Sequence, residues 1–304
     1  MTRREFLAKA AMGYAGTLAV VQLESFAADK AGLPPVAVFS KVYQMLKLNF
    51  EEAAALTADA GLQGVDCPVR PGGEVAPERV KDDLPRYVEA LRKHNLGMPL
   101  MATGVTSLKT PHAEDVLRTA KKLGTNYYRL GPRNPDNAQS LPDQVREFKA
   151  QLKDLAAMNR AIGITGLFQN HSPAGKSTYL GGELGQLHEL VSDLDPASLG
   201  IAFDIAHAFV VHGDDWRRHY EKLKPWIRII YVKDVTRTKK WMPLGKGDTH
   251  QTGYYDLVKK TGYDAPISLH VEYDWDEGGK ARTRERLLKS LQSDLAVLKS
   301  WLGA

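Results

Sequence analysis

The segment Ile201-Ala-Phe-Asp-Ile-Ala-His-Ala208 is an apolar run of strand length that carries one carboxylate, Asp204, and one imidazole, His207. Turn-forming residues stand on both sides of it, at Leu194-Asp-Pro196 and His212-Gly-Asp214. A short continuous apolar run bounded by turns is typical of a buried parallel strand. The pattern predicts a strand that ends near Asp204. In parallel α/β folds, functional side chains stand at the carboxyl ends of the strands. Taken alone, Asp204 could equally cap the next turn and His207 could be a packing residue.

Strand and helix signals alternate eight times along the chain. The predicted strands cover residues 36–42, 64–69, 98–105, 127–130, 164–169, 201–208, 226–235 and 266–273, and the predicted helices cover 50–60, 77–94, 112–123, 142–161, 184–194, 216–223, 255–260 and 282–302. Eight such units over about 250 residues predict a single-domain (β/α)8 TIM barrel of the α/β class. A doubly wound open sheet is the alternative, but no Gly-x-Gly-x-x-Gly turn follows the first strand.

Composition narrows the class of protein. The chain has 304 residues, of which 43% are hydrophobic and 25% charged, and its formal net charge is +5. The basic residues are scattered, so we expect no nucleic-acid partner. After the N-terminus no apolar run approaches the ~18 residues of a membrane span, so we expect no membrane contact. The single Cys67 excludes an internal disulfide.

The N-terminus has the pattern of an export signal. Thr2-Arg-Arg-Glu-Phe-Leu7 is a twin-arginine motif, the segment 10–23 is weakly apolar, and Ser25-Phe-Ala27 offers small residues to a signal peptidase. An amphipathic first helix is the alternative interpretation. We therefore expect a twin-arginine signal peptide at residues 1–27, a linker at 28–35 and the barrel at 36–304, with a periplasmic mature protein.

Charged, imidazole or amide groups stand at seven of the predicted strand ends. Because the carboxyl ends of parallel strands meet at one mouth of a barrel, we expect them to share a cavity. Residues two apart in a strand share a face, so Gln169 should point with His171, and His270 with Glu272. The set is Lys41, Arg70, Arg129, Gln169, His171, Asp204, His207, Lys233, Asp234, His270 and Glu272.

Five motifs follow one another in the second half of the chain. They are Gln169-Asn-His-Ser172, Phe203-Asp-Ile-Ala-His207, Val232-Lys-Asp234, Pro243-Leu-Gly-x-Gly247 and Ile267-Ser-Leu-His-Val-Glu-Tyr273. In this order they resemble the xylose-isomerase-like TIM-barrel family of sugar phosphate isomerases and epimerases. The early segment Val69-Arg-Pro-Gly-Gly73, followed by Asp83-Leu-Pro85, is similar to an exported branch of that family. The resemblance covers essentially residues 36–302.

The resemblance implies one divalent metal (Mn, Mg, Zn or Co) held by Glu, Asp, His and Glu from the last four strands. In this sequence those positions are Gln169, Asp204, Tyr231 and Glu272. Two match and two depart, because glutamine offers only an uncharged oxygen and a protonated tyrosine is a poor ligand. His171 and His270 could substitute, so the metal stays an open expectation.

The same departure bears on mechanism. Family epimerases use two glutamates, but Gln169 cannot ionise, which leaves Glu272 as the expected base, with a pKa raised by burial. His171 or His207 would be the complementary acid. A single base favours isomerisation through an enolate, or elimination, over two-base epimerisation.

The remaining polar groups are expected to bind substrate or to pair structurally. Lys41, Arg70, Arg129 and Lys233 could stabilise an enolate or bind an anion, and we expect at least one to pair with Asp66, Asp204 or Asp234 instead. Gln169 and His270 are further expected substrate contacts. We interpret residues 244–247 as a flexible loop over the site, with a plain turn as the alternative, and Trp241 as a sugar-stacking platform.

The expected function is therefore an isomerase-like enzyme acting on a small sugar or keto-sugar, with catalytic residues Glu272, His171, His207 and Lys233. A lyase or hydratase acting on 3-keto-glycosides is the alternative, and a non-catalytic sugar-binding barrel is the alternative of another class. An apurinic endonuclease would need a His- and Glu-rich zinc cluster that the sequence does not offer. The oligomeric state is left open.

The export signal gives the first testable prediction. Replacing Arg3 and Arg4 together by lysine should leave the protein in the cytoplasm, because the twin-arginine pair is what the exporter recognises. Cell fractionation measures the distribution. Unchanged delivery to the periplasm would contradict the assignment.

Overall fold

The computed structural model describes residues 33–175, 178–273 and 282–303. The predicted signal peptide at residues 1–27 and most of the predicted linker lie outside the described residues. Within the described ranges, no helix is long and apolar enough to cross a membrane.

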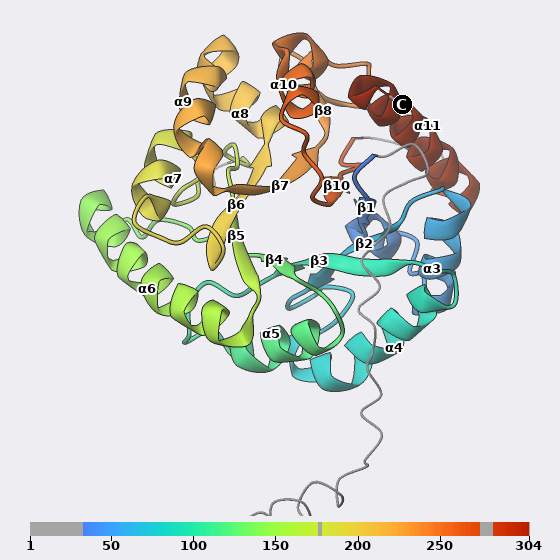
Figure 1. The fold of residues 1–304 in the computed structure, drawn as a ribbon, viewed down its shortest axis with the longest axis horizontal. Helices are drawn as coiled ribbons and strands as arrows, with labels where there is room; N and C mark the ends of the chain where they lie inside the picture. The colour runs from blue at the N-terminus through green and yellow to red at the C-terminus, as the bar shows by residue number, and fades with distance from the viewer. Residues whose placement is uncertain (1–32, 176–177, 274–281, 304) are drawn as a thin grey trace, which may run out of the picture.

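Eight parallel strands close into a barrel, which confirms the predicted fold (Figure 1). Around the barrel their order is β1-β10-β7-β6-β5-β4-β3-β2, and each neighbouring pair is parallel. The strands are β1 (Val36–Phe39), β2 (Gly64–Val69), β3 (Gly97–Thr103), β4 (Tyr127–Arg129), β5 (Thr165–Gln169), β6 (Leu199–Asp204), β7 (Ile227–Val232) and β10 (Ile267–Leu269).

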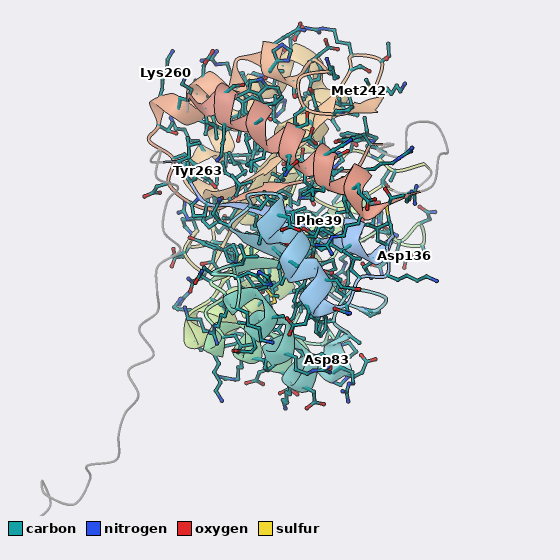
Figure 2. The ribbon with its side chains drawn as sticks, turned by 90° about the vertical axis from the view of Figure 1, so that its right-hand side faces the viewer. Phe39, Asp83, Asp136, Met242, Lys260 and Tyr263 are labelled. Carbon is teal, nitrogen blue, oxygen red and sulfur yellow. The ribbon has the colours of Figure 1, made fainter. Side chains whose placement is uncertain are left out.

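Helices surround the barrel, most of them within a few residues of the predicted ranges. They are α2 (Lys41–Gln44), α3 (Phe50–Asp59), α4 (Val80–Arg92), α5 (Ala113–Lys122), α6 (Leu141–Ile162), α7 (Leu184–Val191), α8 (Ile205–His212), α9 (Trp216–Leu223), α10 (Tyr254–Lys260) and α11 (Arg284–Leu302), with short 3-10 turns η1 (Pro77–Arg79), η2 (Gly213–Asp215), η3 (Lys224–Trp226) and η4 (Thr249–Thr252). In the side view of Figure 2, α11 and α3 lie next to each other outside the barrel. Arg284 bonds Asp59 across them at 3.0 Å, which closes the ring of helices.

The segment 201–208 differs from its predicted form. The strand ends at Asp204 and helix α8 starts at once with Ile205, so the second half of the predicted strand is helical. The Asp204 carboxylate causes the change, because its Oδ1 accepts the backbone N–H of His207 at 3.1 Å and caps the helix. His207 is therefore placed one helical turn beyond the strand end.

Alternation along the strands decides which side chains enter the barrel. In β6, Ile201 and Phe203 pack outward in the main core, whereas Ala202 belongs to the small inner cluster. The inner cluster consists of Ala37, Leu100, Leu167, Ala202, Ile229 and Tyr231. Side chains two residues beyond an inner residue share its face. They emerge at the carboxyl end of the barrel, which is where the candidate site forms.

The segment after β7 is held in place, which corrects the expectation of a flexible loop at 244–247 and agrees with the alternative of a plain turn. It folds back as a hairpin, β8 (Asp234–Val235) with β9 (Trp241–Met242). The Asp234 carboxylate accepts the backbone N–H groups of Gly245, Gly247 and Thr249 at 2.9–3.1 Å. The Thr249 hydroxyl also donates to it at 2.6 Å. The loop amides are thus bound to a carboxylate of the same chain.

Gly247 gives a stability prediction, because a Cβ there would lie 2.3 Å from Asp234 Oδ1 and 2.8 Å from the backbone nitrogen of Val235. Gly247→Ala should therefore lower the free energy of unfolding by ~1–3 kcal/mol, as overpacking does. Urea unfolding followed by circular dichroism measures the change. The matched control is Gly104→Ala, where the nearest atom would be Pro71 Cδ at an ordinary 3.5 Å. Equal stability of the two variants would contradict the packing argument.

Candidate active site

The site begins at three neighbouring strand ends. Gln169, Asp204 and Lys233 each stand two residues beyond an inner residue, after Leu167, Ala202 and Tyr231 respectively. Because barrel strands are staggered, these positions reach the same layer at the mouth. The structure therefore brings together the groups that the sequence placed on β5, β6 and β7.

Lys233 is the centre of this layer. Its Nζ lies 2.6 Å from Glu272 Oε2, 3.0 Å from His207 Nε2 and 3.2 Å from Asp204 Oδ2. An ammonium has three N–H donors and no acceptor, so each proton meets one of these atoms. Only 3% of the Lys233 side chain is exposed. Burial alone would lower the pKa of Lys233, but the two carboxylates outweigh it and raise the pKa, so the group is cationic. The expected structural ion pair of a basic strand-end residue is confirmed here.

The ammonium also fixes the charge of its carboxylate partners. Burial opposes ionisation of Asp204 and Glu272, yet Lys233 outweighs that effect and lowers the pKa of both carboxyl groups. The pKa of Glu272 falls well below its ordinary value. The expectation that burial raises it was wrong, because a buried opposite charge sits 2.6 Å away. Glu272 is thus an ionised carboxylate, 30% exposed to the cavity.

Gln169 has its amide orientation set by two neighbours. Its Nε2 donates to Asp204 Oδ2 at 3.0 Å, and its Oε1 accepts from Arg129 Nη1 at 2.5 Å. A guanidinium only donates and a carboxylate only accepts, so the reverse orientation would lose both bonds. The amide oxygen is therefore directed to Arg129 and away from the Asp204–Glu272 pair.

Two histidine rings lie against each other beside the ammonium, with the centroids of His171 and His207 3.7 Å apart and their planes tilted by 35°. His207 Nε2 accepts from Lys233, so its proton is on Nδ1, which donates to Ser172 Oγ at 2.8 Å. His171 Nδ1 donates to the Ser172 carbonyl at 2.7 Å, which leaves its Nε2 without a proton. Burial, together with Lys233, lowers the pKa of both imidazoles, so both are neutral near pH 7.

Two adjoining cavities open over these groups, with volumes of about 230 and 540 Å³. His171 and Glu272 line both of them. The smaller one is basic, since Lys41, Arg70, Arg129 and Arg133 face it. The larger one is bordered by His207 and Trp241, and Lys233 Nζ lies 5.2 Å from the Trp241 ring centroid.

The two arginines of the predicted set lie over one ring. The Arg70 and Arg129 guanidinium carbons are 5.9 and 5.3 Å from the Phe39 centroid. Neither forms an ion pair with a carboxylate among the described residues, and Arg129 Nε is buried without a hydrogen-bond partner. Burial and the charge of Arg129 lower the pKa of Arg70. Such donors are suited to an oxygen anion of a bound ligand.

His270 and Tyr231 lie one layer deeper than the predicted contacts require. The His270 ring lies between Phe39, on which it stacks at 4.7 Å, and Tyr231, which is tilted against it at 4.5 Å, and His270 is 2% exposed. It borders neither cavity. Asp66, which accepts the Ser268 hydroxyl at 2.8 Å, is buried in the same interior. A substrate contact by His270 stays a prediction that would need this layer to open.

The four positions that the resemblance assigns to a divalent metal do not present a metal site. The side chain of Tyr231 belongs to the barrel interior, and Gln169 turns its amide nitrogen toward Asp204. The Lys233 ammonium contacts both Asp204 and Glu272. A hard cation needs oxygen lone pairs facing a shared centre. Here the fixed positive charge of Lys233 occupies the centre that the oxygens of Asp204 and Glu272 face.

A different group of side chains could hold a metal among the described residues. Glu183, His212 and His219 have ligand atoms within 4.8 Å of one another. They come from the N-cap of α7, the end of α8 and helix α9, and none of them borders the two cavities. This surface cluster was not predicted from the sequence.

Several cavity residues were also missed, among them Ser172, Arg133 and Tyr179. Ser172 orients both histidines, Arg133 lines the smaller cavity, and Tyr179 lines both. The signal for Ser172 was present, since it follows His171 directly in the quoted motif. Arg133 lies four residues beyond the end of β4 and Tyr179 ten beyond the end of β5, where strand alternation gives no direction.

Comparisons with known proteins agree on the fold. The D-psicose 3-epimerase of Clostridium cellulolyticum H10, solved with D-tagatose, superposes with a TM-score of 0.68 at 10% identity, covering 89% of this chain and 100% of that one. A putative xylose isomerase from Rhodospirillum rubrum gives 0.69 at 16% identity over 87% and 98%. The 3-keto-D-glucoside 4-epimerase of E. coli gives 0.66 at 12% identity over 88% and 99%.

Family membership rests on sequence. No curated protein matches the chain at a significant level. The family model described as xylose isomerase-like TIM barrel matches residues 54–299, which is most of the chain. With a closed barrel whose strand ends converge on a polar cavity, the chain belongs to the xylose isomerase-like TIM-barrel family.

Proposed function

We propose that this enzyme isomerises a sugar or keto-sugar through an enolate, with Glu272 as the base. The observation that supports it is that Glu272 and His171 line the same two cavities, each with a free proton-accepting atom. Glu272 is an ionised carboxylate and His171 is a neutral imidazole with a free Nε2. Each can accept a proton from a substrate carbon or hydroxyl between them.

The proton steps balance on residues of this chain. Glu272 removes the proton from the carbon next to a carbonyl, and the C–H electron pair moves to form an enolate. The positive charges of Arg70 and Arg129 lie at the smaller cavity, where they stabilise the enolate oxygen. The proton then returns to the neighbouring carbon while His171 takes the proton of the hydroxyl that becomes the new carbonyl and passes it to the enolate oxygen.

Lys233 limits how strong a base Glu272 is. Their 2.6 Å bond keeps Glu272 ionised, but it also lowers its affinity for a proton. A base is most effective when its pKa is near the operating pH. His171 is therefore the second candidate for the same role, whereas Lys233 is excluded because its raised pKa keeps it protonated.

One observation favours the lyase alternative. The two cavities adjoin at His171 and Glu272, so there is room on both sides of the candidate base. A 3-keto-glycoside has two parts joined by a glycosidic oxygen that lies β to the carbonyl. After proton abstraction, the C–O bond breaks, the enolate electrons form the new double bond, and the departing oxygen takes a proton. A two-part cavity suits such a substrate.

Solvent exchange tests the base. In D2O, the wild-type enzyme should introduce deuterium into at least one member of a panel of ketohexoses and 3-keto-glycosides, measured by NMR and mass spectrometry. Glu272→Gln should slow this exchange by ~10²–10⁴-fold, the range for loss of a general base, while ligand binding by calorimetry is retained. Formation of an isomer indicates an isomerase, and release of the aglycone indicates a lyase.

The matched control is Glu189→Gln on the exposed surface of α7, which should exchange like the wild type. Full exchange by Glu272→Gln would show that the base is another group, and His171→Gln would then be expected to abolish it. Sugar binding without exchange for any compound of the panel would favour the non-catalytic sugar-binding barrel.

A further inference from the structure

The environment of Lys233 differs from that of an ordinary buried ion pair. Its Nζ is surrounded by a carboxylate of β6, a carboxylate beyond β10 and an imidazole of α8, at 3.2, 2.6 and 3.0 Å. The contacting atoms are anionic or lone-pair donors of the kinds that bind metal ions. Asp204 is fully buried and His207 is 2% exposed. A built site for one cation exists here, and a side chain fills it.

We propose that the Lys233 ammonium is the resident cation of this active site, taking the place between Asp204 and Glu272 that a divalent metal would otherwise require. The enzyme then organises its carboxylates without a metal at the barrel mouth. Membership of the family leads us to expect a metal ion, and in this chain the positive charge is instead the side-chain ammonium of Lys233.

Charge accounting supports the exchange. The ligand pattern implied by the resemblance has three carboxylates and a divalent ion, which sum to −1. Here the carboxylates of Asp204 and Glu272 with the ammonium of Lys233 also sum to −1, because Gln169 carries no charge. The loss of one carboxylate removes one negative charge, and the replacement of a divalent ion by an ammonium removes one positive charge, so the two changes cancel. The two departures from the pattern therefore compensate each other electrostatically.

A metal and the ammonium cannot share this place. Oxygen ligands bind divalent ions at about 2.0–2.6 Å, which would put the ion close to Nζ. Two positive charges at such a distance repel strongly in a buried site. Moving the ammonium aside would take the positive charge away from its three partners. Because the Lys233 side chain is only 3% exposed, the displaced charge would stay buried. The Gln169 amide N–H group, directed at Asp204, adds a further positive dipole.

Metal uptake measured without substrate tests the proposal, so its outcome is separate from that of the proposed reaction. All proteins carry His219→Ala, which removes the surface cluster of Glu183, His212 and His219. Equilibrium dialysis against Mn²⁺, with EPR of the free ion, should show no specific site in this parent. Lys233→Ala should bind one equivalent of Mn²⁺, at least about tenfold more tightly than any residual binding by the parent. Tenfold is the scale on which changes beside a metal alter its affinity.

Two further variants sharpen the test. Adding Gln169→Glu to Lys233→Ala should tighten Mn²⁺ again, because it supplies another charged oxygen. Lys246→Ala is the matched control, since Lys246 is exposed on the loop after β9 and its loss should create no site. Circular dichroism confirms folding, and Lys233→Gln replaces Lys233→Ala if the latter does not fold.

Two results would overturn the proposal. The first is a parent protein that binds one equivalent of Mn²⁺ and loses it with Asp204→Asn, because the ammonium would then not hold that place. The second is a folded Lys233 variant, with or without Gln169→Glu, that gains no metal affinity. In that case the ammonium is not what keeps the metal out.

Discussion

The contact of the Lys233 ammonium with Asp204, His207 and Glu272 is the interaction on which the rest of the site depends. A buried charge is tolerated only when its partners satisfy it completely, and here three donors meet three acceptors. The consequences extend outward. The ammonium sets the tautomer of His207, which directs a proton to Ser172, and it holds Glu272 ionised at the cavity. The neutral ring of His171 lies against His207 at the other side of this group.

Lys233 and Asp234 are neighbours in sequence, and their side chains contact different parts of the molecule. Successive side chains of an extended segment point in opposite directions. Lys233 enters the mouth, while Asp234 turns away and accepts three loop amides and a hydroxyl. The carboxylate thus holds the segment 243–249 in one conformation beside Trp241. The loop amides, which could have faced a ligand, are bound instead by a carboxylate of the same chain.

The distribution of charge separates two tasks. Around Lys233 positive and negative groups are matched, so that region organises the carboxylates. Around Phe39 the guanidinium groups of Arg70 and Arg129 have no carboxylate partner among the described residues, so that region is available to an oxygen anion. An enolate is such an anion, and it would form between Glu272 and these arginines. The enolate stabilisation that a metal ion supplies in other enzymes would come here from fixed cationic side chains.

The sequence by itself determined the barrel and the identity of most strand-end groups. The alternation of apolar runs and helix signals predicted β2 and α9 to the residue, and their positions at strand ends predicted that Gln169 and Asp204 share one barrel mouth. These are local properties of the chain. The export signal of residues 1–27 stays a prediction.

Only the tertiary structure decided which groups meet. Asp204 pairs in register with Tyr231, yet the side chain that contacts its carboxylate comes from Lys233, two residues further on, and no local pattern encodes that contact. It also decided that Glu272 has a lowered pKa, because the sign depends on a cation supplied by another strand. The start of α8 at Ile205 and the fixed loop beyond β8 followed from hydrogen bonds made by Asp204 and Asp234. Distances between side chains that are far apart in sequence are set by packing of the whole barrel, and these distances turn a list of polar residues into a site.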